Sequence, residues 1–150
     1  GLIGGVLSSA WPLLDLAARG PKLQYGGTDK IDGRQVHKLR YLPREGGELK
    51  ITIFIDAENF HHLRTEYERV IAAPMGATPG ESAGLREMRY KLVENFRDFK
   101  TEGGLTLPHT YTMQYFVFKI DNPIALDWTF NLTRFTFDYP IEEKEFLVDT

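Results

Sequence analysis

A short motif near the middle of the chain has the spacing of a serine nucleophile. Residues 80–84 read Gly-Glu-Ser-Ala-Gly, which matches the Gly-x-Ser-x-Gly pattern of serine esterases. In those enzymes the serine lies on a sharp turn between a buried strand of a parallel sheet and a helix. Here Pro79 and a glycine-containing stretch precede the motif, and no buried strand does. We therefore predict that the protein is not an enzyme, and a hydrolase stays an alternative carried by Ser82 alone.

The histidines are the residues from which a metal site would be built. His61 and His62 are adjacent, so on a strand their side chains point to opposite faces and cannot both bind one metal ion. His37 and His109 fall in other parts of the chain. The chain contains no cysteine, which excludes disulfides, thiolate zinc sites and cysteine nucleophiles. We predict no metal site and no cofactor.

Composition sets the class of protein. The chain has 150 residues, of which 42% are hydrophobic and 26% charged, so we expect one globular domain over residues 1–150. It has 18 basic and 21 acidic residues, which give a net charge of −3. Nucleic-acid binding is not expected, because there is no basic excess to neutralise phosphates. No stretch approaches the roughly 20 apolar residues of a membrane span, so no transmembrane segment is predicted.

The elements that would position these side chains follow from the apolar periodicity. Residues 2–18 carry a helical apolar stripe, interrupted at Pro12 and ended by Gly20-Pro21. From residue 22 the period becomes two, and short connections between consecutive strands require antiparallel pairing. We predict an antiparallel meander over 22–139. Its strands are 23–31, 35–42, 49–55, 60–71, 86–99, 107–120 and 125–139, and 86–99 also has the composition of a helix.

The connections have their own signals. Asp32-Gly33 predicts a two-residue hairpin turn. Residues 72–84 contain two prolines and three glycines, so we expect a mobile surface loop. The apolar positions of the last strand change parity after Arg134, which predicts a β-bulge at Thr133-Arg134. Residues 140–150 form a tail, with one helical turn expected at 142–146.

Three runs of sequence resemble a known family. Residues 25–39 read Tyr-Gly-Gly-Thr-Asp-Lys-Ile-Asp-Gly-Arg-Gln-Val-His-Lys-Leu, residues 55–64 begin Ile-Asp-Ala-Glu-Asn, and residues 99–109 include Gly-Gly-Leu-Thr-Leu-Pro. They are similar to the outer-membrane lipoprotein-sorting proteins, the LolA-like superfamily of bacterial envelope carriers. The resemblance covers residues 20–147 and only the C-terminal portion of such proteins. Whether this chain is the C-terminal part of a longer one stays open.

The resemblance carries expectations about fold, location and ligand. It implies a curved, incomplete antiparallel β-barrel with helices in its mouth, a concave face that holds acyl chains, and the periplasm or cell envelope of a bacterium. Joined to the periodicity, it gives a mostly β member of the α+β class. That fold is a curved antiparallel sheet of about seven strands with an N-terminal helix on its concave side.

Aromatic and aliphatic side chains alternate along the last two predicted strands. If those strands pair as a hairpin, two apolar sets fall on one face of the sheet. We predict that this face binds lipid or lipoprotein acyl chains. Two alternatives stay open: these residues are ordinary core, or the chain is an interaction module that pairs through its sheet. Such a module would pair with a partner, with its own missing N-terminal half, or as a homodimer through edge strands. The candidate ligand-binding residues are Tyr111, Met113, Tyr115, Trp128, Phe130 and Leu132.

Overall fold

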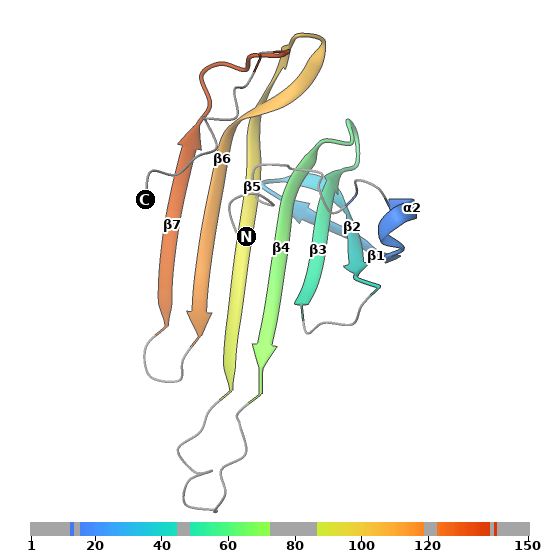
Figure 1. Ribbon diagram of the computed structural model, residues 1–150, viewed down its shortest axis with the longest axis vertical. Coiled ribbons are helices and arrows are strands. Elements are labelled where there is room, and N and C mark those ends of the chain that lie inside the picture. Colours follow the sequence, from blue (N-terminus) through green and yellow to red (C-terminus); the bar gives the residue numbers. More distant parts are fainter. Residues whose placement is uncertain are drawn as a thin grey trace, which may run out of the picture.

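Seven strands form one antiparallel sheet in which every strand pairs with its neighbours in chain order (Figure 1). The computed structural model describes residues 13, 16–44, 49–72, 87–118, 123–138 and 140. Within these, the sheet is open and not closed into a barrel, with β1 and β7 as its two edges. The strands are β1 (Lys22–Ile31), β2 (Arg34–Leu42), β3 (Leu49–Asp56), β4 (His62–Ile71), β5 (Met88–Glu102), β6 (Leu105–Phe118) and β7 (Ile124–Asn131).

The predicted mostly β meander is confirmed, whereas the predicted helix over 2–18 is not. Of that segment the structure describes residue 13 and a single helical turn, α2 (Leu16–Arg19). An N-terminal helix on the concave side therefore stays a prediction. The predicted mobile loop 72–84 lies outside the described residues apart from Ala72, and the tail 140–150 lies outside them apart from Pro140.

The prediction for the end of the last strand was wrong. β7 ends at Asn131, and residues 132–138 contain neither a strand nor the bulge expected at Thr133-Arg134. The Leu132 N–H donates to the His109 carbonyl oxygen at 2.7 Å, one position beyond the end of β7. Beyond it the chain folds onto the β5–β6 hairpin, where the Phe135 ring meets the His109 ring edge-on at 5.3 Å. The apolar residues therefore change from even to odd positions after Arg134 because the chain has left the sheet, and no bulge is needed to explain the change.

Two hairpin turns have backbone geometry that favours glycine. Asp32 and Gly33 have φ values of 50° and 82°, and Gly103 and Gly104 have 57° and 81°. Positive φ at both central residues is the two-residue turn that matches the twist of the flanking strands. The predicted Asp32-Gly33 turn is confirmed, and the second turn joins the two longest strands, β5 and β6.

Gly103 also lies against the segment that leaves β7, which gives a testable prediction. A Cβ at Gly103 would lie 2.6 Å from Cε2 of Phe137, whereas nothing lies within 4 Å of a Cβ at Gly104. Both positions have positive φ, so Gly103→Ala and Gly104→Ala both carry a backbone cost. We expect Gly103→Ala to lower the free energy of unfolding by about 1 kcal/mol more than Gly104→Ala, measured by urea titration. In a Phe137→Ala background this difference should vanish; an equal cost of the two substitutions in the wild-type background would contradict the contact.

The register gives the sheet two chemically different faces. Tyr67 of β4 lies opposite Leu92 of β5, and Leu92 lies opposite Tyr115 of β6. We call this side the apolar face; its buried centre is Leu92, Phe96 and Tyr111.

The other side is the polar face. There Lys91 Nζ lies 2.8 Å from Glu66 Oε2, and Arg64 Nε donates to Asn95 Oδ1 at 2.7 Å. Asn95 Nδ2 in turn donates to Thr112 Oγ1 at 3.2 Å. This chain of contacts joins β4, β5 and β6 side by side.

The sheet bends between its first two strands and the rest. In Figure 1, β1 and β2 run across the direction of β3 to β7, and the tip of their hairpin reaches β5. Arg97 Nη2 lies 2.9 Å from Asp32 Oδ2 at that tip. Ile31 packs there in a second buried cluster with Val36, Phe54 and Leu63. At the opposite end Leu16 of α2 packs against a third cluster, formed by Tyr41, Ile51 and Ile53.

Candidate ligand-binding face

The register brings five of the six predicted site residues onto the apolar face. Tyr111 lies opposite Phe130, and Met113 lies opposite Trp128. Tyr115 lies opposite Leu126, a residue that sequence reasoning did not include. Leu132 lies one position beyond the end of β7 and is tied to His109 through its backbone. Ile124, opposite Val117, belongs to the same row and was also missed. Strict alternation from Trp128 would have found both Leu126 and Ile124.

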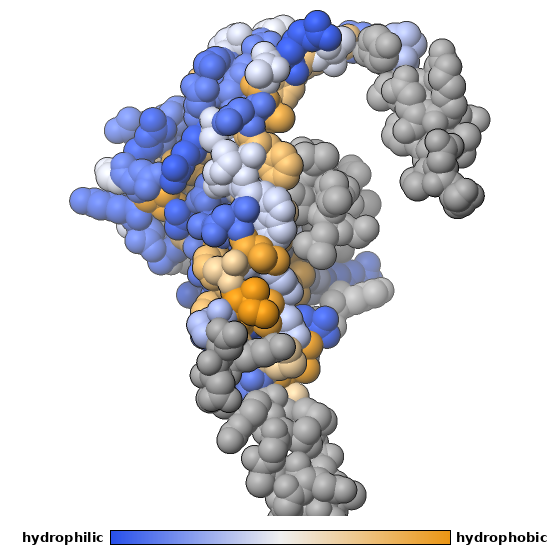
Figure 2. Space-filling view, turned by 90° about the vertical axis from the view of Figure 1, so that its left-hand side faces the viewer, coloured by the Kyte–Doolittle hydropathy of each residue, from blue (hydrophilic) through white to orange (hydrophobic). Residues whose placement is uncertain are grey.

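Exposure increases along this row from β6 to β7. Tyr111 is 4% exposed, whereas Phe130 is 40%, Trp128 39% and Leu126 46% exposed. Figure 2 looks onto the β7 edge and shows hydrophobic side chains gathered in its lower half, beside a hydrophilic surface on the left. The apolar face therefore runs from a buried centre to an uncovered margin formed by Ile124, Leu126, Trp128 and Phe130, which we call the β7 margin.

Aromatic rings connect this margin to the middle of the sheet. The ring centroids of Tyr111 and Phe130 lie 5.4 Å apart, and those of Phe96 and Tyr111 lie 5.3 Å apart. His62 continues the row, 4.7 Å from Phe96. These separations are those of favourable aromatic pairs. One aromatic row thus crosses β4, β5, β6 and β7.

A buried carboxyl lies inside this apolar region. Glu94 is 2% exposed, and the register sets it opposite Thr65 of β4 and Met113 of β6. The Tyr111 hydroxyl donates to Glu94 Oε1 at 2.8 Å. Burial raises the pKa of Glu94, while hydrogen bonds from Tyr67 and Tyr111 act in the opposite direction. Burial and the nearby Glu94 carboxyl raise the pKa of Tyr111 as well.

A pocket of about 420 Å³ opens beside the aromatic row. Pairing of β4 with β5 ends at Arg64 opposite Asn95, and β5 continues beyond that point with β6 alone. The strands separate there, and the tip of the β1–β2 hairpin closes one side. Its lining residues include Ile31, Asp32, Arg34, His61, Leu63, Phe96, Arg97 and Phe99.

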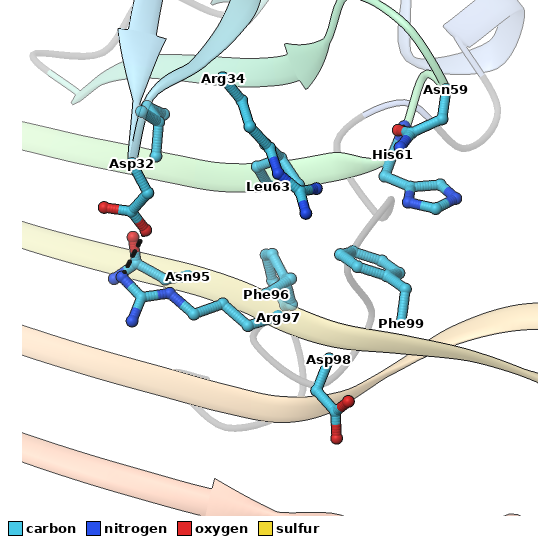
Figure 3. A pocket seen from close by; sticks show the side chains of 11 residues that line it. Asp32, Arg34, Asn59, His61, Leu63, Asn95, Phe96, Arg97, Asp98 and Phe99 are labelled. Atoms are coloured by element: carbon cyan, nitrogen blue, oxygen red, sulfur yellow. Dashed lines mark hydrogen bonds and ion pairs between the residues drawn. The ribbon is translucent and has the colours of Figure 1, made fainter.

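Figure 3 shows how the pocket combines polar and apolar groups. Phe96 and Phe99 point from β5 toward Leu63 and His61, and the Arg34 guanidinium enters from β2. The His61 ring stacks on Phe99 at 4.4 Å. Phe96 belongs both to this pocket and to the aromatic row, so the two regions adjoin.

The charged groups around the pocket have partners in the fold. Arg34 Nη1 lies 3.4 Å from Oδ2 of Asp56, which is 3% exposed. The N–H groups of Glu58 and Asn59 and the Arg34 charge lower the pKa of Asp56, against the opposing effect of burial. These contacts hold the β3–β4 turn against β2.

The histidines have separate structural roles. The ring Nδ1 of His109 lies 2.8 Å from the Leu132 carbonyl oxygen, so this nitrogen carries the proton and donates it. Its Nε2 lies 3.2 Å from Glu102 Oε1. His37 Nδ1 contacts the Tyr25 hydroxyl at 3.0 Å, and His62 Nε2 contacts Thr65 Oγ1 at 2.6 Å. Among the described residues, no three histidine or carboxylate side chains are grouped to hold a metal ion.

Two further predicted features concern catalysis and membranes. Ser82 lies outside the described residues. In the portions of the chain that the structure describes, no helix is long and apolar enough to cross a membrane. Comparison with protein-family models, curated proteins and solved structures found no match to this chain.

Proposed function

We propose that the protein is a non-enzymatic, carrier-like module of the bacterial envelope that binds lipid or lipoprotein acyl chains on the apolar face of its sheet. The observation that carries this proposal is the β7 margin, whose side chains are 39–46% exposed although they belong to the same row as the buried centre. The resemblance of residues 25–39, 55–64 and 99–109 to the lipoprotein-sorting family supports the ligand class and the location.

The proposed contact is apolar and open at one side. An acyl chain lying along the β7 margin would cover Leu126, Trp128 and Phe130, and would reach Tyr111 through its stacked neighbour. Burying about 300 Å² of apolar surface contributes about 7 kcal/mol. Ordering of the chain offsets part of this gain, so the expected affinity is micromolar at best.

Trp128 reports on occupancy of this surface. The chain has two tryptophans, Trp11 and Trp128, so the experiment uses a Trp11→Phe background in which Trp128 is the single emitter. Titration with a lysophospholipid below its micelle concentration should shift the emission to shorter wavelength, because the indole leaves water. We expect a saturable shift with a micromolar midpoint. An emission spectrum that does not respond to lipid would reject the acyl-chain proposal.

A matched pair of substitutions separates binding from general hydrophobicity. Phe130 and Phe118 are 40% and 41% exposed but lie on opposite faces, since Phe130 pairs with Tyr111 and Phe118 pairs with Arg89. Phe130→Asp should abolish the lipid response and Phe118→Asp should retain it, with circular dichroism checking the fold of both. Should Phe130→Asp unfold, Leu126→Asp tests the same margin at a residue that is 46% exposed. Equal loss of response in the variants of both faces would contradict the proposed surface.

The second candidate function is a module that pairs through its sheet. The specific observation in its favour is that, among the described strands, β7 pairs with β6 alone, and that all eight of its residues are exposed. This candidate predicts no emission change with lipid and a self-association that does not require lipid.

A further inference from the structure

No described strand covers the outer edge of β7. One hydrogen bond shows which of its backbone N–H and C=O groups point toward β6 and which point outward. The Leu132 N–H donates to the His109 carbonyl oxygen, and the register of β6 and β7 continues through this pair. In an antiparallel ladder, every second residue exchanges two backbone hydrogen bonds with the residue opposite it on the partner strand. The N–H and C=O groups of the residues between them point away from that strand. The backbone N–H and C=O groups of Phe130 and Trp128 therefore bond to β6. Those of Asp127 and Thr129 point outward, away from β6.

The two edges of the sheet differ in how they are protected. β1 carries a register shift between Tyr25 and Thr28, where Gly27 has a φ of 84°, and its last residues include Asp29 and Lys30. Bulges and charges of this kind block edge-to-edge pairing. β7 has no register shift, and its single charged residue is Asp127. Gln114 Nε2 donates to the Asp127 carboxylate at 2.7 Å on the polar face.

We propose that β7 pairs antiparallel with β7 of a second copy of this chain, with the two-fold axis at Trp128. This inference rests on the second candidate function, the module that pairs through its sheet, and its tests use no lipid. Residues that lie opposite each other across such an axis must share a face, so their numbers must add to an even sum. With the axis at Trp128, Leu126 lies opposite Phe130 of the second copy, and the β7 margins of the two copies become one apolar surface.

The same register gives hydrogen-bond partners to the outward-pointing backbone groups and keeps the two Asp127 carboxylates from lying opposite each other. Asp127 then lies opposite Thr129 of the second copy, and both residues have outward-pointing N–H and C=O groups that can bond to each other. Trp128 lies opposite Trp128 of the second copy. This is a pair without backbone hydrogen bonds, and in such pairs the side chains of antiparallel strands come closest. An axis at Asp127 would oppose the two Asp127 carboxylates directly, and like charges in that position are destabilising. An axis at Thr129 would set Leu126 opposite Leu132, which lies beyond the end of β7, and would shorten the paired stretch. The axis at Trp128 is therefore the favoured one of the three.

A charge placed at Thr129 tests the register in both directions. Thr129 is exposed and lies on the polar face, outside the β7 margin. Thr129→Asp creates two Asp–Asp pairs across the axis, and Thr129→Lys creates two Lys–Asp pairs. In sedimentation velocity, we expect a monomer–dimer equilibrium for the wild type. The dissociation constant should rise by about 2- to 30-fold for Thr129→Asp and fall by a similar factor for Thr129→Lys. A wild type that stays monomeric up to about 1 mM, which corresponds to a binding free energy weaker than about 4 kcal/mol, would overturn the proposal. So would a shift in the same direction for both variants.

Disulfide formation reads the register directly, because the chain has no native cysteine. Asp127→Cys and Thr129→Cys variants are oxidised separately and as an equimolar mixture. The opposed positions lie at a Cα separation of about 5.5 Å, which a disulfide can bridge. We expect the mixture to form the mixed disulfide dimer and neither variant to form one efficiently alone. Efficient crosslinking of Asp127→Cys with itself would overturn the register in favour of an axis at Asp127, and no crosslinking in any sample would overturn the edge pairing.

Discussion

Phe96→Ala is expected to lower the free energy of unfolding by about 3–5 kcal/mol, the usual cost of removing a buried phenylalanine. Phe96 is 4% exposed and packs with Leu92 and Tyr111 at the centre of the apolar face. Its ring also contacts the His62 ring at 4.7 Å and lines the neighbouring pocket. One substitution therefore removes contacts to β4 and β6 together. Thermal unfolding should show a fall in Tm of about 10 °C for a domain of this size.

Phe60→Ala is the matched control for this substitution. Phe60 lies in the β3–β4 turn and is 71% exposed, so its removal should change the free energy of unfolding by less than about 0.5 kcal/mol. Similar losses for both variants would show that ring removal acts through the unfolded chain. A loss below about 1 kcal/mol for Phe96→Ala would mean that the aromatic row is not part of the core.

The features that were predicted correctly have local causes. The alternation of Leu49, Ile51, Ile53 and Ile55 gives β3 its strand period, and the structure has β3 at Leu49–Asp56. Asp32-Gly33 encodes its own turn, because both residues tolerate positive φ. With several such strands and short links between them, the antiparallel meander follows from chain connectivity alone.

The features that were missed depend on contacts between distant parts of the chain. A change of apolar parity after Arg134 is equally compatible with a bulge and with an exit from the sheet. The contact of Phe137 with Gly103 decides between them, and no local pattern encodes it. The pocket likewise needs the bend that brings Asp32 to Arg97. Leu63, on its wall, lies where the register of β3 and β4 shifts.

Part of the candidate site could be predicted from the sequence. Alternation placed Tyr111, Met113, Trp128 and Phe130 on one face once a hairpin was assumed, and the register agrees. Alternation along residues 86–99 sets Glu94, a charged residue, on the same side as the apolar Leu92 and Phe96. That mismatch was the signal for a buried carboxyl. Its partner, the Tyr111 hydroxyl, is 17 residues away and follows from the β5–β6 register alone.

Glu94→Gln is expected to change how stability depends on pH. Burial raises the pKa of Glu94 above its ordinary value of 4.5, so the folded protein holds a proton that the unfolded chain has already released. Stability contributed by the neutral carboxyl is complete below that ordinary value and is lost as pH rises through the raised pKa. The loss is at most about 1.4 kcal/mol per pH unit for one group. Glutamine has nearly the same shape and no proton to lose, so it removes this slope.

Urea unfolding at several pH values between about 5 and 8 measures the difference, within the range in which a raised carboxyl pKa acts. Near pH 5 the two proteins should have similar free energies of unfolding, because Tyr111 can donate to the amide oxygen of the variant as it does to Glu94 Oε1. As the pH rises, wild type should lose stability relative to Glu94→Gln, and the variant should become the more stable protein. Glu58→Gln, a change at an exposed residue, controls for the loss of one negative charge.

At lower pH the free energy of unfolding should rise with pH, the opposite of the trend that Glu94 causes. This rise has a different cause, Asp56, and provides an internal check. The pKa of Asp56 is lowered below 3.8 by the N–H groups of the β3–β4 turn, so its contribution is present above that value and is lost on further acidification. Glu94→Gln should leave this acid limb unchanged, because Glu94 and Asp56 lie on different faces of the sheet. A Glu94→Gln variant that runs parallel to wild type from pH 5 to 8 would mean that Glu94 releases its proton in the folded state as readily as in the unfolded chain.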